Sequence, residues 1–173
     1  MLTLEKGEAF DTPQAILSYS GTGLTKLSQQ YHEIIREHIC RGAYKHAKRP
    51  ILINNWEATY FDFNEEKILK IAEQAQKLGI EMLVLDDGWF GKREDDNSGL
   101  GDWLVNEKKM NGSMAQLAEK IHRMGMKFGL WFEPEMISED SDLYRAHPDW
   151  AFAIPGRVPN HSRNQLVLDM TRE

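Results

Sequence analysis

Two segments of the chain carry the same order of signals, and this repeat limits the folds that the chain can adopt. Residues 64–85 and 113–132 each begin with a helix-capping residue and continue with apolar side chains at helical spacing. In each segment a glycine then ends the helix and is followed at once by an apolar run that is typical of a buried strand. Helices that alternate with strands indicate parallel strands in one sheet, so the chain is predicted to have an α/β fold.

The helix signals are specific in both segments. Asn64 is a suitable N-cap, and Ser113 with Gln116 forms a capping box, in which each side chain binds the backbone amide of the other. The glycines that end the helices, Gly79 and Gly125, lie 46 residues apart. The apolar positions of the two predicted helices are Ile68, Ile71, Ala72, Ala75 and Leu78, and Met114, Leu117, Ile121 and Met124.

Three strands are predicted, at residues 51–54, 82–85 and 127–132, and residues 166–168 are a candidate for a fourth. Strands joined by helices are the arrangement of a TIM-type barrel, but a closed barrel needs eight parallel strands. The chain is therefore predicted to be a partial TIM (β/α)8 barrel with about the first three to four βα units. Its outermost strands would lack partners.

The sequence before this region has a different character. Pro13 and the turn cluster SYSGTG at 18–23 indicate short strands or irregular chain. From Leu24 to about Ile39 apolar side chains return at helical spacing, which predicts an amphipathic connector helix. Arg49-Pro50 ends this region, because proline does not continue a helix.

Composition limits the partners of the chain. The net charge of −6 argues against non-specific nucleic-acid binding, and no apolar run approaches the roughly 18 residues needed to span a bilayer. A single cysteine, Cys40, excludes an internal disulfide and suits a reducing compartment. Because the acidic start does not resemble a secretory signal either, a cytoplasmic protein is predicted. No cofactor is predicted, and no metal site, because the histidines lack ligand spacing: His32, His38, His46, His122, His147 and His161.

Polar and aromatic side chains follow each of the three predicted strands. The stretches are Asn54-Asn55-Trp56-Glu57, Asp86-Asp87-Gly88-Trp89 and, after Trp131 at the third strand end, Glu133-Pro134-Glu135. The carboxyl ends of parallel strands form the edge where α/β proteins build their sites. Indole rings pack against the C–H faces of a sugar ring, and carboxylates accept hydrogen bonds from its hydroxyl groups. The pattern favours a sugar site, and two carboxylates are also the minimum for glycoside hydrolysis.

Simpler interpretations of these residues stay open. An aspartate at a strand end commonly caps the following helix, Trp56 could be ordinary core packing, and Glu133 and Glu135 could pair with basic side chains. A calcium loop that starts at Asp96 fits poorly, because Leu100 stands where an oxygen ligand is needed. A Ser-His-Asp hydrolase is disfavoured, because the chain has no G-x-S-x-G motif.

Several longer stretches carry a family resemblance. They are RPILINNWEATYFDF (49–63), LVLDDGWFGKREDD (83–96), GLGDW (99–103), GLWFEPEMIS (129–138), HPDW (147–150) and RNQLVLD (163–169). In order and spacing they resemble the bacterial α-galactosidases of glycoside hydrolase family 36, the melibiase-like family, over nearly the whole chain. The resemblance implies a retaining hydrolase that removes terminal α-galactose from melibiose, raffinose and similar oligosaccharides. It also implies that the full-length enzyme is a homo-oligomer.

The resemblance also suggests a place for the chain in a longer enzyme. In this family the catalytic (β/α)8 barrel lies between an N-terminal β-supersandwich and a C-terminal β-domain. Residues 1–23 are then the tail of the N-terminal β-domain, and residues 24–48 are the connector helix. Residues 49–173 are the N-terminal part of the catalytic barrel.

The resemblance implies substrate-binding roles for a small set of residues. Asp86 and Asp87 match the pair that holds the O4 and O6 hydroxyl groups of galactose. An acid fixed at the axial O4 would separate galactose from glucose. Trp56 and Trp131 match the walls of the sugar pocket, and Arg163 matches an arginine that reaches into the same pocket.

One departure from the family pattern concerns catalysis. The nucleophile of the family is the aspartate of a K-W-D-x-N-R motif, and its acid/base is a later aspartate; neither motif occurs among the 173 residues. Both catalytic residues are therefore expected beyond Glu173, and none is assigned within the chain. The prediction is a piece of an α-galactosidase that is inactive by itself. The alternatives are a catalytically inactive galactose-binding or complementing module and a relative of the raffinose-synthase-like transferases.

Overall fold

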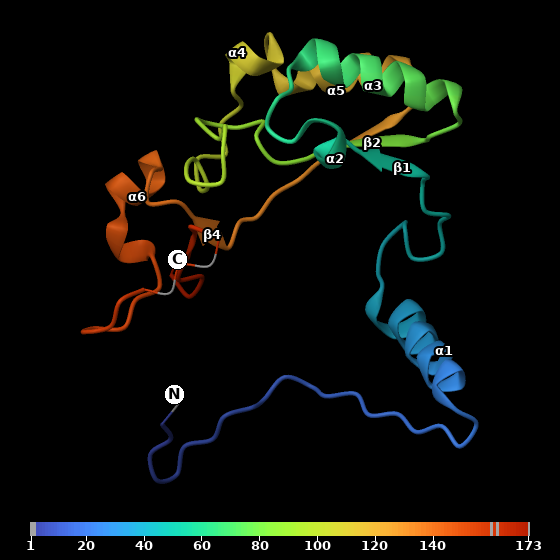
Figure 1. Ribbon diagram of the computed structural model, residues 1–173. Coiled ribbons are helices and arrows are strands. Elements are labelled where there is room, and N and C mark those ends of the chain that lie inside the picture. The colour runs from blue at the N-terminus through green and yellow to red at the C-terminus, as the bar shows by residue number, and fades with distance from the viewer. Residues whose placement is uncertain (1–2, 160, 162, 173) are drawn as a thin grey trace. The chain divides into compact units, whose positions relative to one another are not determined.

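The structure, a computed structural model, describes residues 3–159, 161 and 163–172. It divides into two compact units, Met1–Arg49 and Pro50–Glu173, and each is described by itself (Figure 1). All of the residues that the sequence singles out as a candidate site belong to the second unit.

The first unit consists of extended chain and one helix. Helix α1 (Leu24–Ile34) continues as the π-helical turn η1 (Ile35–Ile39), so the helix predicted from Leu24 to Ile39 is confirmed. Residues 40–48 form turns and bends rather than helix. The Tyr31 hydroxyl donates a hydrogen bond to the Ile16 carbonyl at 3.2 Å, which ties the extended segment to α1. The role of this helix as a connector in a longer enzyme stays a prediction.

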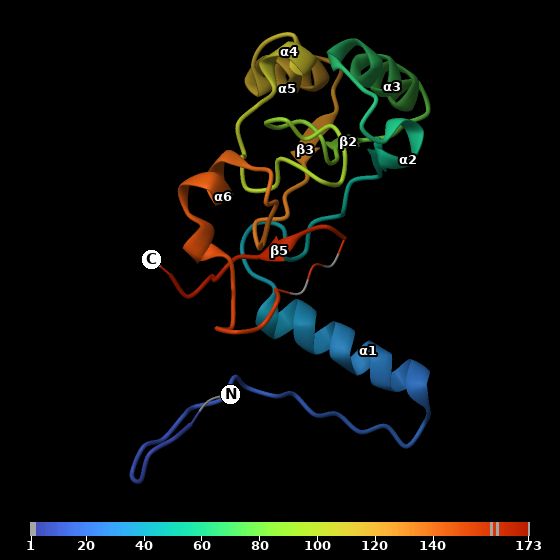
Figure 2. The same cartoon turned by 60° about the vertical axis from the view of Figure 1, so that its left-hand side comes forward.

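A three-stranded parallel sheet forms the centre of the second unit. Its strands are β1 (Leu52–Asn54), β2 (Met82–Leu85) and β3 (Lys127–Leu130), with β2 in the middle. Helices α3 (Glu65–Lys77) and α5 (Met114–Arg123) lie next to each other on one side of the sheet in both views (Figure 1, Figure 2). The predicted α/β class and the three predicted strands are confirmed, although the third ends at Leu130 rather than at residue 132.

Local capping interactions define where the two helices begin and end. The side chain of Asn64 accepts a hydrogen bond from a backbone amide of the first turn at 2.9 Å, and Ser113 and Gln116 form the predicted capping box. Gly79 and Gly125 follow the helix ends with φ of 82° and 77°, values that suit glycine because it has no Cβ. All of these predicted caps are confirmed.

Shorter elements complete the second unit. They are α2 (Trp56–Thr59), α4 (Glu107–Met110), β4 (Met136–Ile137), α6 (Asp142–Ala146), η2 (Pro148–Trp150) and β5 (Leu166–Val167). Within the part of the chain that the structure describes, none of the helices is long and apolar enough to cross a membrane.

The prediction of a fourth parallel strand at residues 166–168 is wrong. β5 pairs with β4 in an antiparallel arrangement, with Met136 beside Val167 and Ile137 beside Leu166. Ile137 and Leu166 are both buried, so this apolar run finds its partner outside the parallel sheet. An apolar run predicts a strand but does not identify the neighbouring strand. The described residues therefore form a mixed α/β unit with a small parallel sheet.

The core of the second unit lies between the sheet and the two helices. Leu83 and Leu85 of β2 are fully buried, together with Ile68 of α3 and Leu117 of α5. Full burial of such a side chain contributes about 1.5–3 kcal/mol to folding. Leu78, which helical spacing places on the same stripe, is 82% exposed, because it stands at the C-cap of α3 where the helical periodicity stops. The interpretation of Leu78 as part of the apolar face of this helix is therefore wrong.

Leu83 and Leu78 offer a matched pair of substitutions. We expect Leu83→Ala to lower the free energy of unfolding by about 2–5 kcal/mol, because it opens a cavity at the centre of the sheet. Leu78→Ala should change the same quantity by less than about 0.5 kcal/mol. Urea unfolding followed by tryptophan fluorescence measures both, and equal losses in the two variants would contradict a core centred on β2.

Candidate functional site

The carboxyl ends of the three parallel strands meet at one edge of the sheet. β1 ends at Asn54, Asp86 follows β2, and Trp131 follows β3. The Asn54 side-chain amide donates a hydrogen bond to the Asp86 carboxylate, and the Trp131 backbone amide donates to the Leu85 carbonyl at 2.9 Å. Direct contacts therefore join the strand ends that the sequence pattern predicts to lie close together.

Two asparagines connect the first strand end to the second. Asn55 is fully buried; its side-chain oxygen accepts a hydrogen bond from the Asp86 amide at 2.8 Å, and its side-chain nitrogen donates to Thr59 at 2.9 Å. Asn54 accepts a hydrogen bond from the Trp56 amide at 2.7 Å while it donates to Asp86. Trp56 and Asp86 thus share Asn54 as a neighbour. Sequence reasoning notes both asparagines but assigns neither this role.

Asp86 and Asp87 are neighbours in sequence but have different surroundings. Asp86 is half-buried, and its carboxylate accepts hydrogen bonds from the Asn54 side chain and from the Asp87 amide, the latter at 2.7 Å. Asp87 is only 4% exposed, and its carboxylate accepts hydrogen bonds from Nε and Nη2 of Arg93 at 2.8 to 3.1 Å. One acid is therefore open to a ligand, whereas the other is largely occupied by a buried cation.

Arg93 is a residue of this site that sequence reasoning misses. Its side chain is fully buried, Nη1 donates to the Ser98 carbonyl at 3.0 Å, and the guanidinium lies 5.5 Å from the centre of the Phe61 ring. Burial of a charge is costly unless the charge is paired and hydrogen-bonded, and the Asp87 carboxylate provides both. In the sequence Arg93 belongs to the charged run 92–96, and such runs are usually exposed.

The glycine and the tryptophan after the two acids fix the course of the chain as it leaves β2. Gly88 has a φ of 95°, and a Cβ at this position would lie 2.9 Å from the Phe61 ring, so a larger residue would be strained. Trp89 is 2% exposed, and its indole nitrogen donates to the Trp131 carbonyl at 3.0 Å. The chain therefore turns sharply after Asp87 and is anchored to the end of β3.

Trp56 and Trp131 belong to different aromatic groups. The Trp56 ring meets the rings of Tyr60 and Phe61 edge to face, with centroids 5.2 and 5.0 Å away. The Trp131 ring packs beside Trp103, with centroids 6.2 Å apart. Both tryptophans are half-buried, so each keeps part of its surface open to a ligand.

Arg163 approaches the strand ends from the C-terminal segment. Its Nη2 lies 3.8 Å from Oδ1 of Asp96, and the same oxygen lies 3.6 Å from Nη2 of Arg93. Asn164 donates a hydrogen bond to the Asn97 side chain at 2.8 Å, which ties the same segment to the loop after β2. Arg163 is thus linked to the buried ion pair through Asp96, although its own side chain is 65% exposed.

Glu133 follows the third strand and interacts electrostatically with Arg163, Arg93 and Asp87. Burial raises the pKa of its carboxyl group, Arg163 acts in the opposite direction, and Glu135 adds to the rise. The buried side chain of Gln165 donates a hydrogen bond to Glu133 at 3.4 Å. The carboxyl group therefore keeps its proton to a higher pH than an ordinary glutamate. Among the described residues, no group of three or more His, Cys, Asp or Glu side chains is arranged to hold a metal ion.

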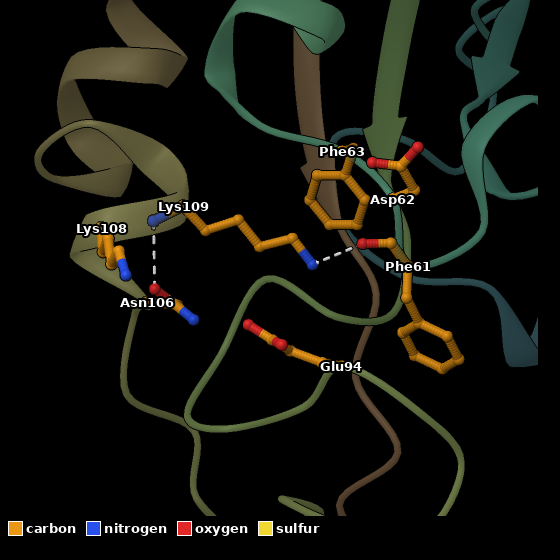
Figure 3. A pocket seen from close by; sticks show the side chains of 7 residues that line it. All are labelled: Phe61, Asp62, Phe63, Glu94, Asn106, Lys108 and Lys109. Atoms are coloured by element: carbon orange, nitrogen blue, oxygen red, sulfur yellow. Dashed lines mark hydrogen bonds between the residues drawn. The ribbon is translucent and has the colours of Figure 1, made fainter.

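A cavity of about 510 Å³ lies beside Lys109 (Figure 3). Nζ of Lys109 donates to the carbonyls of Phe61 and Gly88 at 2.7 and 2.9 Å and lies 4.0 Å from the centre of the Phe63 ring. Burial lowers the pKa of Lys109, and the charge of Glu94 opposes this change. Because the ammonium group is already engaged, we interpret Lys109 as a clamp on the chain next to Asp87. No predicted site residue lines the cavity, which is bounded by Phe61, Asp62, Phe63, Glu94, Asn106, Lys108 and Lys109.

Comparison with known proteins identifies the family. The family model described as Melibiase matches residues 9–173. The chain belongs to the melibiase family. The resemblance noted in the sequence is therefore confirmed, and the melibiase-family relatives are α-galactosidases of glycoside hydrolase family 36.

Two curated relatives show how much of a melibiase-family enzyme this chain represents. The bifunctional α-galactosidase/sucrose kinase AgaSK of Mediterraneibacter gnavus is 62% identical over 170 residues, which are 98% of this chain and 18% of that protein. The α-galactosidase AgaA of Geobacillus stearothermophilus is 56% identical over 170 residues, 98% of this chain and 23% of that protein. The chain thus spans about a fifth of the length of these relatives.

Solved structures of the family contain the same arrangement. The crystal structure of AgaA matches with a TM-score of 0.85 at 57% identity, over 90% of this chain and 22% of that one. The galactosidase domain of AgaSK matches with a TM-score of 0.84 at 63% identity, over 90% and 22% of the two chains. The mixed α/β unit of this melibiase-family chain is therefore part of the family 36 α-galactosidase structure.

Glu133 gives this melibiase-family chain an expected dependence of stability on pH. The pKa of its carboxyl is raised above the ordinary 4.5. At a pH between 4.5 and the raised pKa, the folded chain therefore holds a proton that the unfolded chain has lost. Stability from this group therefore falls as pH rises through that range. We expect Glu133→Gln to raise the thermal midpoint relative to the wild type at about pH 7 and to leave it unchanged below about pH 4. The control is Glu73→Gln, at an exposed acid on α3. An equal gain in both variants, or a gain that is largest in acid, would contradict this account.

Proposed function

We propose that this chain supplies the galactose-recognition part of a retaining α-galactosidase. The observation that carries the proposal is the contact network at the ends of β1 and β2. There the half-buried carboxylate of Asp86 is held by Asn54 and by the Asp87 amide, and Trp56 is bound to the same asparagine. A fixed carboxylate near an indole ring suits a sugar, which offers both hydroxyl groups and a C–H face.

The proposed substrates are α-galactosides of the melibiose and raffinose type. Crystal structures of variants of AgaA, which are 57% identical to this chain, are complexes with raffinose and with stachyose. We assign Asp86 and Asp87 to the O4 and O6 hydroxyl groups of the terminal galactose, Trp56 and Trp131 to its sides, and Arg163 to the same pocket. O4 is axial in galactose and equatorial in glucose. When glucose is bound, protein acceptors placed for an axial O4 would therefore lack a hydrogen-bond partner.

The proposed setting of the site is the beginning of a (β/α)8 barrel. The order of the three parallel strands and the position of the site at their carboxyl ends both support this assignment. Residues 1–23 are assigned to the tail of a preceding β-domain, residues 24–48 to a connector and residues 49–173 to the barrel. The full-length enzyme is proposed to be cytoplasmic, in keeping with the single cysteine, and homo-oligomeric.

These residues by themselves are proposed to bind galactose without cleaving its glycosides. Retaining glycosidases use two carboxyl groups, one as nucleophile and one as acid/base. The family resemblance assigns the nucleophile to a K-W-D-x-N-R motif, which the 173 residues do not contain. The same observation favours a second candidate function, a galactose-binding or complementing module without catalytic activity.

Asp86→Asn tests the recognition proposal directly, because it replaces a charged acceptor by a neutral amide of the same size. We expect the wild-type chain to bind galactose in preference to glucose, and the variant to bind galactose about tenfold more weakly or worse, since hydrogen bonds to a charged group contribute about 1.5–3 kcal/mol. Ligand-observed NMR titrations with both sugars measure these affinities. The matched control is Asp62→Asn, at an acid whose side chain is 91% exposed.

Two results would contradict the proposal. Equal affinity of the wild-type chain for galactose and glucose would remove the recognition role. Hydrolysis of an aryl α-galactoside above the level of a heat-denatured control would show that the chain holds a complete catalytic pair. Selective binding without hydrolysis supports both parts of the proposal.

A further inference from the structure

Arg93 binds both carboxylate oxygens of Asp87 through its Nε and Nη2 groups. Its Nε lies 3.0 and 3.1 Å from the two carboxylate oxygens, and its Nη2 lies 2.8 Å from Oδ2. The guanidinium is planar and rigid, so these contacts fix the plane of the carboxylate as well as its position. The side chain of Arg93 has an exposure of 0%, so it cannot itself touch a bound ligand.

These contacts change what Asp87 can offer to a sugar. A carboxylate has about four acceptor sites. The three N···O contacts with Arg93 occupy about three of them, so about one site remains for a ligand. The charge of Asp87 is also balanced by the guanidinium. In Asp86, by contrast, each oxygen accepts one hydrogen bond, from the Asn54 side chain or the Asp87 amide. Within the described residues, no lysine or arginine forms an ion pair with Asp86.

Asp96 extends the same network to Arg163. Its Oδ1 is buried and accepts no hydrogen bond from the described residues, yet it lies 3.6 Å from Nη2 of Arg93 and 3.8 Å from Nη2 of Arg163. One carboxylate oxygen therefore stands between two guanidinium groups. Without this anion the two cations would repel each other at short range. Asp96 therefore lies within ion-pair distance of both Arg93 and Arg163.

We propose that Arg93 is a positioning residue of the galactose site: it holds Asp87 as a single oriented acceptor and, through Asp96, sets the place of Arg163. This inference rests on the proposed function of the site. Arg93 acts on a sugar only through these other side chains. Selectivity for galactose then depends on a residue that the sugar does not touch.

Arg93→Lys separates positioning from charge. Lysine keeps a positive charge beside Asp87, so the buried acid stays paired, but a point-like ammonium group does not fix the plane of a carboxylate. We expect the affinity for galactose to fall about tenfold and the preference for galactose over glucose to shrink by a similar factor. The matched control is Arg123→Lys, because Arg123 pairs with Glu119 at a side-chain exposure of 73%. The control should keep wild-type affinity and preference.

Asp96→Asn tests the link to Arg163 at a position that is less buried than Arg93. The variant removes the anion between the two arginines, and we expect galactose to bind about three- to tenfold more weakly because Arg163 loses its fixed position. The control is Asp95→Asn in the same loop, where the side-chain oxygen that accepts from the Asn97 amide is kept. Both affinities are measured by the titration used for the wild-type chain.

The carboxyl carbon NMR resonance of Asp87 tests the positioning role without any sugar. It should shift in Arg93→Lys and stay in place in Arg123→Lys. If the wild-type chain binds no galactose, the proposed function fails, but this resonance still decides whether Arg93 orients Asp87. An unmoved resonance, or wild-type galactose affinity in folded Arg93→Lys, overturns the inference. If Arg93→Lys loses its folded amide spectrum, Asp96→Asn decides, and an Asp96→Asn chain that behaves like the wild type overturns it.

Discussion

The buried ion pair between Asp87 and Arg93 determines how the chain continues after β2. Removal of two charges from water costs several kcal/mol per ion, and close N–H···O contacts together with the Ser98 carbonyl offset this cost. The loop that carries Arg93 must therefore fold back over the strand end. Gly99 belongs to this constraint, because its φ is 81° and a Cβ there would lie 2.9 Å from the Arg93 amide nitrogen. The ion pair and Gly99 therefore both constrain the loop after β2.

The ion pair also explains why two adjacent acids differ in character. Asp86 and Asp87 follow the end of β2, and their carboxylates accept hydrogen bonds from different partners. Asp87 turns to the buried guanidinium, and Asp86 turns to Asn54 at the end of β1. The parallel register makes the second contact possible, because it brings Asn54 beside Val84, two residues before Asp86. The sheet and the loop therefore each hold one of the two carboxylates.

Local signals in the sequence suffice for the parts of the fold that depend on neighbouring residues. The caps at Asn64 and Ser113 and the three parallel strands are of this kind, since each signal lies within a few positions of the element it defines. Contacts between distant segments are different. No apolar pattern around Arg93 predicts that it is buried. Asn55 is fully buried because the Asp86 amide and Thr59 form hydrogen bonds with its side chain. The family resemblance points to the acids at the strand ends, but it does not show that a cation already occupies one of them.

The antiparallel pairing of β5, which sequence reasoning does not predict, is what keeps Arg163 near the other site residues. A residue just before a fourth parallel strand would lie at the amino end of the sheet, on the edge opposite Asp86. Instead β4 follows β3 beyond its carboxyl end and β5 pairs with β4, so the residues before β5 stay at that edge. The hydrogen bond from Asn164 to Asn97 holds them against the loop after β2. Arg163 can therefore lie beside Asp96 because β5 pairs with β4 and does not join the parallel sheet.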